Sequence, residues 1–195
     1  MTFKILKSPH THEEVIKKSL FMGVCFHCDK PTEFMSQLDQ FADPAATHNC
    51  WAYKIGNEYR FNDDGEPSGT AGKPILAALD GSGFDHIGAL VIRHYGGIKL
   101  GTGGLARAYG GTIARLLQAA PFTTHLPMTT LKLQADFQHS QMIFQLVAQL
   151  NGQIDDQTFS TRGATFVLRI PQQQVSAFTA DIDNLTKGSG TLENI

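Results

Sequence analysis

Residues 87–119 have the sequence IGALVIRHYGGIKLGTGGLARAYGGTIARLLQA. The run begins with apolar residues that predict a buried strand from Ile87 to Tyr95. It ends in the clearest helical pattern of the chain, Leu105 to Ala119, where apolar residues recur at helical spacing. A glycine-rich turn lies between the two. A strand that leads through glycine into a helix is typical of layered α/β domains.

The composition is that of a chain able to bury a core. Of its 195 residues, 42% are hydrophobic and 17% are charged, which excludes a disordered chain. Nineteen residues are glycines, and thirteen of these fall between Gly65 and Gly111. This crowding indicates backbone that side chains would obstruct, so the middle of the chain is where we expect a functional site.

The charge is balanced overall but not locally. The formal net charge of −2 excludes a polybasic protein that holds nucleic acid by bulk charge alone. No acidic residue occurs from His86 to Ala135. Within that stretch lie Arg93, Lys99, Arg107 and Arg115. The sequence therefore predicts a positive patch on a nearly neutral protein.

The sequence favours a cytoplasmic protein. The first residues, MTFKILK, lead into no apolar signal segment, and no stretch approaches the ~18 apolar residues of a membrane span. Cys25, Cys28 and Cys50 form an odd set, which is simplest as reduced thiols packed in the fold. Cys25 and Cys28 have the C-x-x-C spacing of zinc and redox sites, but they would lie on opposite faces of a regular strand.

A domain boundary is expected near residues 121–130, where two prolines interrupt a polar stretch after the long helix. We expect a first domain over residues 1–124 and a second over 129–195. The second has the predicted order βαββαβ, which suits a ferredoxin-like α+β domain. Its expected strands are 130–137, 153–159, 164–170 and 191–195, and its helices are 140–150 and a segment that starts at Pro171.

The first domain is expected to be a mixed α/β layer. Besides the elements of residues 87–119, strands are predicted at 3–7, 15–27 and 48–55, and helices at 31–41 and 71–79.

The glycine-rich turn is the first candidate site. A turn at a helix N-terminus exposes unpaired N–H groups and the positive end of the helix dipole, which favour an anion such as phosphate. Thr102 can cap that helix or donate its hydroxyl to the anion, and Gly103 and Gly104 leave room for it. The turn lacks the spacing of the nucleotide-binding glycine fingerprints.

The second candidate is the loop Asn62 to Pro74, with the sequence NDDGEPSGTAGKP. Asp63, Asp64 and Glu66 have the chemistry to hold a divalent cation or supply a general base. The same residue types are equally typical of a tight turn and a helix cap, which is the reading that we favour. Lys73 adds a cation at the start of the following helix.

A third candidate lies in the strand predicted at 48–55. His48 and Cys50 are two residues apart and so share a face, a pairing found at nucleophilic sites. Nothing in the sequence supplies an orienting partner. We therefore expect a packed histidine and a buried thiol.

Three ordered motifs resemble the IMPACT family, and within it the bacterial YigZ-like branch. They are ATHNCWAY at 46–53, DDGEPSGTAGKP at 63–74 and VIRHYGGIKLGTGGLARAY at 91–109. The resemblance implies an N-terminal domain like the second domain of ribosomal protein S5. It also implies a C-terminal ferredoxin-like domain similar to late domains of elongation factor G. Both folds recur in translation proteins.

The chain departs from the family pattern at two positions. Leu20 stands where the family usually has a basic residue, which removes one charge from the expected binding face. His94 stands where the family usually has an aromatic residue beside Tyr95, which weakens a stacking role at that position.

The favoured hypothesis is a non-enzymatic protein, without cofactor or metal, that contacts structured RNA or the ribosome and modulates translation. Arg93, Lys99 and Arg107 would pair with phosphates, Thr102, Gly103 and Gly104 would cradle one, and Lys73 would support them. Tyr95 and Tyr109 would stack on bases.

Two alternatives remain open. In the first, the chain is an enzyme that acts on a phosphorylated small molecule. Asp63, Asp64 or Glu66 would then bind magnesium, and His48 would serve as acid or base. In the second, it is a purely protein-binding regulator whose C-terminal domain docks a partner.

Overall fold

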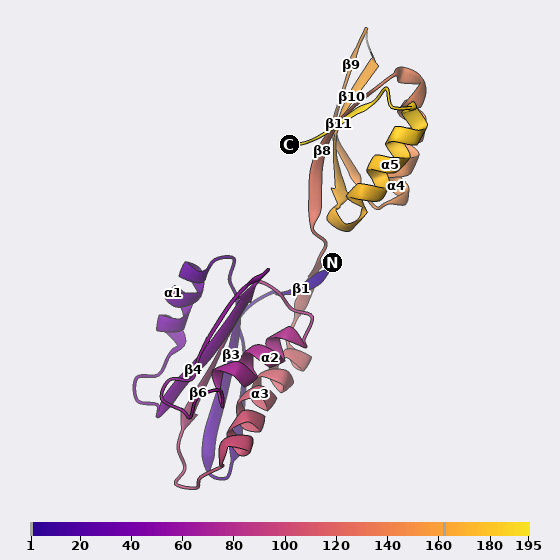
Figure 1. The fold of residues 1–195 in the computed structure, drawn as a ribbon. Helices are drawn as coiled ribbons and strands as arrows, with labels where there is room; N and C mark the ends of the chain where they lie inside the picture. Colours follow the sequence, from indigo (N-terminus) through magenta and orange to yellow (C-terminus); the bar gives the residue numbers. More distant parts are fainter. Residues whose placement is uncertain (1, 162) are drawn as a thin grey trace. The chain divides into compact units, whose positions relative to one another are not determined.

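The computed structural model describes residues 2–161 and 163–195, which form two compact α/β units (Figure 1). The N-terminal unit spans Phe3–His125 and the C-terminal unit spans Leu126–Ile195. In the part of the chain that the structure describes, no helix is long and apolar enough to cross a membrane.

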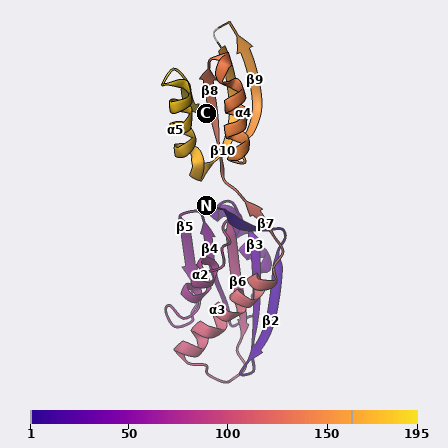
Figure 2. The same cartoon turned by 90° about the vertical axis from the view of Figure 1, so that its right-hand side faces the viewer.

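The N-terminal unit is built on a five-stranded sheet with the order β2-β3-β6-β4-β5, in which every neighbouring pair is antiparallel (Figure 2). The strands are β2 (His10–Ile16), β3 (Ser19–His27), β4 (His48–Ile55), β5 (Glu58–Asn62) and β6 (Ile87–His94). A separate two-stranded sheet pairs β1 (Phe3–Leu6) with β7 (Phe122–His125).

Helices cover both faces of this sheet, so the unit has three layers. Helices α2 (Gly72–Asp80) and α3 (Thr102–Ala119) pack on one face, and α1 (Pro31–Phe41) packs on the other (Figure 1). The central strand β6 is buried along all but its last residue. Burial on both faces explains why its sequence is continuously apolar rather than alternating.

The segment predicted as one strand from Val15 to His27 is instead the hairpin β2–β3. Its two-residue turn is Lys17-Lys18, with φ values of 45° and 66°. Such turns usually contain asparagine or glycine, and without that signal the turn was missed. The short strands β5 and β7 were also missed, and β7 falls within the stretch expected to be a linker.

Helix α3 begins at Thr102, three residues before the predicted start. Gly101 precedes it with φ +76°, a conformation that glycine adopts without strain. A further glycine, Gly96, fixes the end of β6 against the β2–β3 hairpin. A Cβ placed there would lie 1.9 Å from the Lys18 carbonyl oxygen, so only glycine fits this close approach.

The C-terminal unit has the predicted element order βαββαβ. Its strands are β8 (Met128–Ala135), β9 (Gln153–Ser160), β10 (Gly163–Pro171) and β11 (Thr191–Asn194), and its helices are α4 (Ser140–Gln149) and α5 (Val175–Thr186). The antiparallel sheet has the order β11-β8-β10-β9, and both helices cover the same face (Figure 1). Pro171 ends β10 rather than starting a helix. A short 3₁₀ turn, Gln172–Gln174, separates it from α5.

Candidate functional site

A cavity of about 460 Å³ opens in the N-terminal unit where the end of β6, the start of β4 and the N-terminus of α3 meet. Its volume is typical of a small-ligand pocket. The lining residues are Thr47, His48, Glu66, Pro67, Arg93, Tyr95, Lys99, Leu100, Gly101, Thr102 and Leu105.

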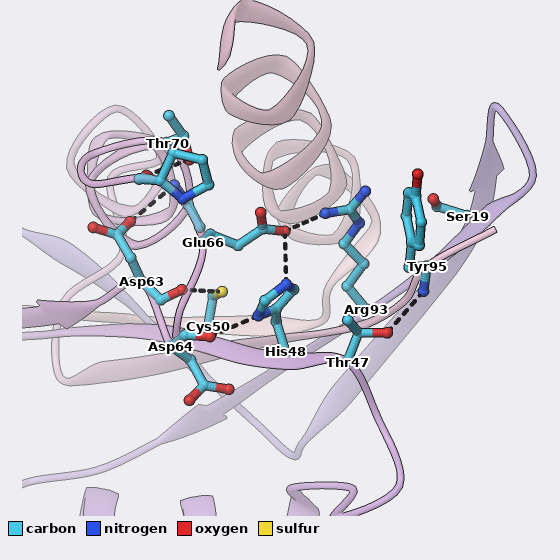
Figure 3. Close-up of polar contacts among 12 residues, drawn as sticks. Ser19, Thr47, His48, Cys50, Asp63, Asp64, Glu66, Thr70, Arg93 and Tyr95 are labelled. Atoms are coloured by element: carbon cyan, nitrogen blue, oxygen red, sulfur yellow. Dashed lines mark hydrogen bonds and ion pairs between the residues drawn. The ribbon is translucent and has the colours of Figure 1, made fainter. Parts of the chain in front are cut away.

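The sheet register brings the central side chains together. His48 of β4 lies directly opposite Arg93 of β6 in the antiparallel ladder, so their side chains point to the same face. Glu66, from the loop between β5 and α2, reaches over this face (Figure 3). Residues far apart in sequence therefore form one polar cluster within the cavity wall.

Glu66 is the centre of this cluster. Its Oε1 atom accepts a hydrogen bond from Arg93 Nη1 and another, of 2.7 Å, from the hydroxyl of Tyr109. The Glu66 and Arg93 side chains are only 4% and 6% exposed. A charge pair removed from water this completely is costly unless each partner is compensated, and breaking it leaves an unpaired buried charge. The buried pair is therefore unfavourable for the stability of the fold, and its place in the cavity wall points to a function there.

Arg93 is also held by aromatic rings. Its guanidinium carbon lies 5.4 Å from the Phe21 ring centroid and 5.3 Å from that of Tyr95, within the range of cation–π attraction. Its buried Nε has no hydrogen-bond partner among the described residues. The guanidinium is therefore fixed in place while part of its donor capacity stays unused.

His48 has a defined orientation. Its Nδ1 atom lies 2.7 Å from the backbone carbonyl oxygen of Asp64, and its Nε2 atom lies 3.8 Å from Glu66 Oε1 (Figure 3). The first distance is a hydrogen bond and the second exceeds one. The ring is therefore anchored through Nδ1, with Nε2 on the side of the cavity.

The carboxylates of Asp63 and Asp64 do not join Glu66. Asp63 accepts from the backbone N–H groups of Gly69, Ala71 and Gly72 at 2.7, 3.0 and 2.8 Å, which satisfies donors at the N-terminus of α2. Asp64 accepts from the N–H of Asn49 at 2.5 Å. No cluster of three or more metal-ligating side chains occurs in the described parts of the chain. Asp63 thus caps the N-terminus of α2, and Asp64 ties the loop to the start of β4.

The positive patch predicted from sequence is partly compensated in space. Besides Arg93, Arg115 pairs with Glu14 of β2. Burial would raise the pKa of Glu14, but hydrogen bonds from Arg115 and Thr112 outweigh it and hold the pKa below its usual value. Among the described residues, Lys99 and Arg107 form no ion pair, and both are exposed. They are the cations of this region that remain available.

Only some of the other predicted binding residues lie in the cavity wall. Lys99, Thr102 and Tyr95 line the cavity, whereas Gly103, Gly104, Arg107 and Lys73 do not. Gly104 and Arg107 line a smaller neighbouring cavity of about 210 Å³ together with Lys17. Lys73 is exposed in the first turn of α2.

The structure contradicts the stacking role predicted for Tyr109. It is fully buried, its ring meets Phe21 edge-on at 5.3 Å, and its hydroxyl donates to Glu66. A ring enclosed in this way cannot stack on a base from solution. Burial raises the pKa of Tyr109, and the neighbouring Cys50 and Glu66 raise it further. Tyr95 is 44% exposed and keeps a face available.

The three cysteines are free and buried. Cys50 donates through its Sγ to the backbone carbonyl of Asp63 at 3.0 Å. Burial, reinforced by nearby carboxylates, raises the pKa of its thiol to about 12. A thiol with such a pKa is not a nucleophile at neutral pH, and Cys50 serves to hold the Asp63 loop against β4.

Four lining residues were not singled out from the sequence: Thr47, Pro67, Leu100 and Leu105. Thr47 accepts a hydrogen bond of 2.9 Å from the backbone N–H of Tyr95 and so links the start of β4 to the end of β6. Leu100 and Leu105 give the cavity an apolar wall. Their place inside the quoted motifs was the only available signal.

The fold and site define a two-domain α/β protein whose N-terminal unit holds a cavity with one buried ion pair at a helix N-terminus. Residues 17–117 match the Impact N-terminal domain, and residues 133–189 match a domain of unknown function, DUF1949. The chain belongs to the IMPACT family.

Similar proteins extend over nearly the whole chain. An IMPACT family member of Haemophilus influenzae is 36% identical over 95% of this chain and 93% of its own length. The IMPACT family member YigZ of Escherichia coli is 37% identical over 93% of this chain and 92% of its own length. A crystal structure titled as a hypothetical protein is 35% identical, covers 100% of this chain and 97% of its own, and has a TM-score of 0.65.

Proposed function

We propose that this protein binds structured RNA or the ribosome in the cytoplasm, modulates translation without catalysing a reaction, and holds one phosphate-bearing nucleotide in the cavity of the N-terminal unit. The observation that carries the proposal is the cavity at the N-terminus of α3, lined by Arg93 and Lys99. N–H groups at a helix N-terminus, together with cationic side chains, attract a phosphate.

The charge within the cavity favours an anion. Glu66 neutralises Arg93, so the charge of Lys99 and the positive end of the helix dipole remain in excess. Asp63 and Asp64 are engaged by backbone N–H groups and do not oppose a phosphate there. The cavity therefore suits an anionic group of limited size.

The volume of the cavity limits the contact. About 460 Å³ accommodates one nucleotide rather than a duplex, and Arg93 is too deeply buried to grip an extended backbone. Lys73 and Arg107, both exposed, are proposed as outer contacts to neighbouring phosphates. A small contact of this kind agrees with the net charge of −2, which does not support broad electrostatic binding.

The fold assignments extend the same proposal. We assign the C-terminal unit to the ferredoxin-like type, as in late domains of elongation factor G, on its βαββαβ order and its strand order β11-β8-β10-β9. We assign the N-terminal unit to the type of the second domain of ribosomal protein S5. Both types recur in translation proteins, which supports the proposal by analogy of fold.

The test measures binding of a labelled single-stranded RNA by fluorescence anisotropy at several salt concentrations. Lys99→Ala is expected to weaken binding about fivefold and to lower the salt slope by about one phosphate. Lys30→Ala is the matched control, because Lys30 is equally exposed but precedes α1 on the opposite face of the sheet. Absence of salt-sensitive association with RNA, and with ribosomes in a pelleting assay, would overturn the proposal.

A second candidate function is an enzyme that acts on a phosphorylated small molecule. It is favoured by one observation, that His48 and Glu66 line the same cavity of ligand size. Thermal melting with a panel of nucleotides, with and without magnesium, separates the two. Stabilisation by a single nucleotide at micromolar concentration, together with its turnover, would favour the enzyme.

We also propose the C-terminal unit as a surface for a protein partner. Phe137 and Phe159 are more than half exposed, and their rings stack with centroids 5.9 Å apart. Grouped exposed aromatic side chains are typical of protein contact sites. Phe159→Ser is expected to reduce recovery of ribosome-associated proteins in a pull-down without changing RNA affinity. Unchanged recovery would remove this role.

A further inference from the structure

The tautomer of His48 follows from its backbone partner. A carbonyl oxygen can only accept a hydrogen bond, so the 2.7 Å contact with the Asp64 carbonyl requires a proton on Nδ1. In the neutral ring Nε2 then carries a lone pair and acts as an acceptor. Within the cavity, His48 therefore presents an acceptor, on a side chain that is 19% exposed.

Among the described residues, no hydrogen bond is made to this acceptor. Glu66 Oε1 lies 3.8 Å from it and is itself an acceptor. Glu66 Oε1 already takes donors from Arg93 and Tyr109. Two acceptors that face each other across this gap are complementary to a donor supplied by a ligand, such as a hydroxyl group.

Other lining residues have the reverse requirement. Lys99 and Thr102, with the first turn of α3, present donors and positive charge to the same cavity. A complementary ligand therefore carries a hydroxyl donor beside an anionic group. A ribose with a free 2′-hydroxyl next to its 3′-phosphate has this chemistry, whereas deoxyribose lacks the donor.

A further lining residue, Tyr95, suits the base. Tyr95 is 44% exposed and lines the cavity, and its inner face is occupied by the Arg93 guanidinium. The hydrogen bond from its backbone N–H to Thr47 ties the Tyr95 backbone to the start of β4. An aromatic side chain held in this way offers a stacking surface that tolerates any base.

We infer that His48 Nε2 accepts a hydrogen bond from the ribose 2′-hydroxyl of a bound nucleotide and thereby makes the cavity selective for RNA over DNA. The inference rests on the proposed function and names its ligand class. His48 is a specificity-determining contact, and Lys99 supplies affinity that both kinds of nucleic acid share.

The experiment compares one short single-stranded sequence made as RNA, as 2′-fluoro RNA and as DNA. The 2′-fluoro sugar keeps the ribose pucker but cannot donate a hydrogen bond, so it isolates the hydroxyl from the backbone shape. RNA is expected to bind about tenfold more tightly than 2′-fluoro RNA, the range of one well-placed hydrogen bond. Equal binding of RNA and 2′-fluoro RNA, still weakened by Lys99→Ala, would overturn the inference and leave the proposed function standing.

Two substitutions of His48 test the roles of its two ring nitrogens separately. In His48→Asn the amide keeps a donor near the Nδ1 position but offers nothing at Nε2, so the preference for RNA is expected to disappear. In His48→Gln an amide oxygen can occupy the Nε2 position, and part of the preference is expected to return. If both variants keep the preference for RNA, the role of Nε2 is contradicted.

Competition identifies the source of the ribose. Inorganic phosphate and a ribonucleoside 3′-monophosphate are added to the preformed RNA complex. Weak competition by both is expected, because neighbouring phosphates of the RNA also contribute. A mononucleotide that binds as tightly as the oligonucleotide would overturn the assignment to RNA, and failure of every nucleic acid to bind would overturn the proposed function as well.

Discussion

The two units of this chain differ in how deeply their arginine–carboxylate ion pairs are buried. The N-terminal unit keeps the Arg93–Glu66 pair within its wall, almost fully removed from water. The core of the C-terminal unit is formed by apolar side chains, and its Arg169–Asp155 pair lies on the surface, where the hydrogen bond from Arg169 lowers the pKa of Asp155. A protein gains little stability by burying charge. The buried pair agrees with the ligand site proposed for the N-terminal unit, whereas the core of the C-terminal unit is apolar.

The largest expected effect comes from cutting the buried pair. Arg93→Ala leaves Glu66 buried without its cation and is expected to cost about 3–5 kcal/mol of unfolding free energy. Arg169→Ala in the C-terminal unit removes an exposed pair and is expected to change little. Denaturant unfolding followed by the fluorescence of Trp51, the single tryptophan, measures the first. Amide hydrogen exchange of β8 and β10 measures the second.

A double variant separates stability from function. Arg93→Met combined with Glu66→Leu replaces the pair by apolar side chains of similar size and is expected to recover part of the lost stability, because the buried hydroxyl of Tyr109 then lacks its acceptor. RNA binding is expected to be weakened both in Arg93→Ala and in the double variant, since neither has the fixed guanidinium in the cavity wall. Equal losses from Arg93→Ala and Arg169→Ala would remove the contrast between the units.

Only part of the candidate site could be predicted from the sequence, because some of its residues meet through long-range contacts. The glycine turn, Lys99 and Thr102 lie within one short segment, so local pattern was enough to find them. The Glu66–Arg93 pair joins residues 27 positions apart and depends on the register that sets His48 opposite Arg93. Strand register between distant segments leaves no local signal. Tyr109 was mistaken for an exposed ring for a different reason: its helical spacing with Leu105 and Ile113 places it on the buried face of α3, a local signal that the stacking hypothesis ignored.

The fold was more accessible, because hydrophobic periodicity is local. It located β4, α1 and β6 closely, and the element order of the C-terminal unit was correct. The hairpin at Lys17-Lys18 was missed because its turn lacks asparagine and glycine. Exposed β5 was missed because it has no buried face to impose alternation.

Alkaline pH is expected to weaken one unit and spare the other. Burial raises the pKa of Cys28 and Cys50 from 9.0 to about 12. Their contribution to stability is complete below the unfolded pKa and declines as pH rises from about 9 to 12, by about 1.4 kcal/mol per thiol per pH unit. The segment Leu126–Ile195 contains no cysteine or tyrosine. At pH 10 these two thiols alone should have cost the N-terminal unit about 3 kcal/mol. Burial raises the pKa of Cys25 as well, which adds to the loss that Trp51 fluorescence reports.

Hydrogen exchange at pH 7 and after brief exposure to pH 10 provides the comparison for the C-terminal unit, which should keep its protection. Cys50→Ser combined with Cys28→Ala removes two of the three buried thiols and should reduce the alkaline loss of the N-terminal unit by about 3 kcal/mol. Parallel loss of both units would show that the alkaline effect does not come from these thiols.

Two glycines test whether close backbone approach serves the site or only the packing. A Cβ at Gly96 would lie 1.9 Å from the Lys18 carbonyl oxygen, and one at Gly163 would lie 2.5 Å from the Ala135 carbonyl oxygen. Alanine at either position is expected to cost about 1–3 kcal/mol in its own unit. Gly96→Ala alone is expected to reduce RNA affinity, because Gly96 directly follows Tyr95 in the cavity wall. RNA affinity reduced as much by Gly163→Ala would contradict this division.

The smallest expected effect comes from the exposed aromatic pair of the C-terminal unit. Phe159→Ser removes a ring that is 59% exposed and stacks on Phe137, which is expected to cost less than about 1 kcal/mol. Phe166→Ala is the matched control, because Phe166 is fully buried in the same sheet and its truncation should cost about 3–5 kcal/mol. Hydrogen exchange of β8 measures both. A large loss from Phe159→Ser would assign that ring to the fold, whereas a small loss leaves it free to contact a partner.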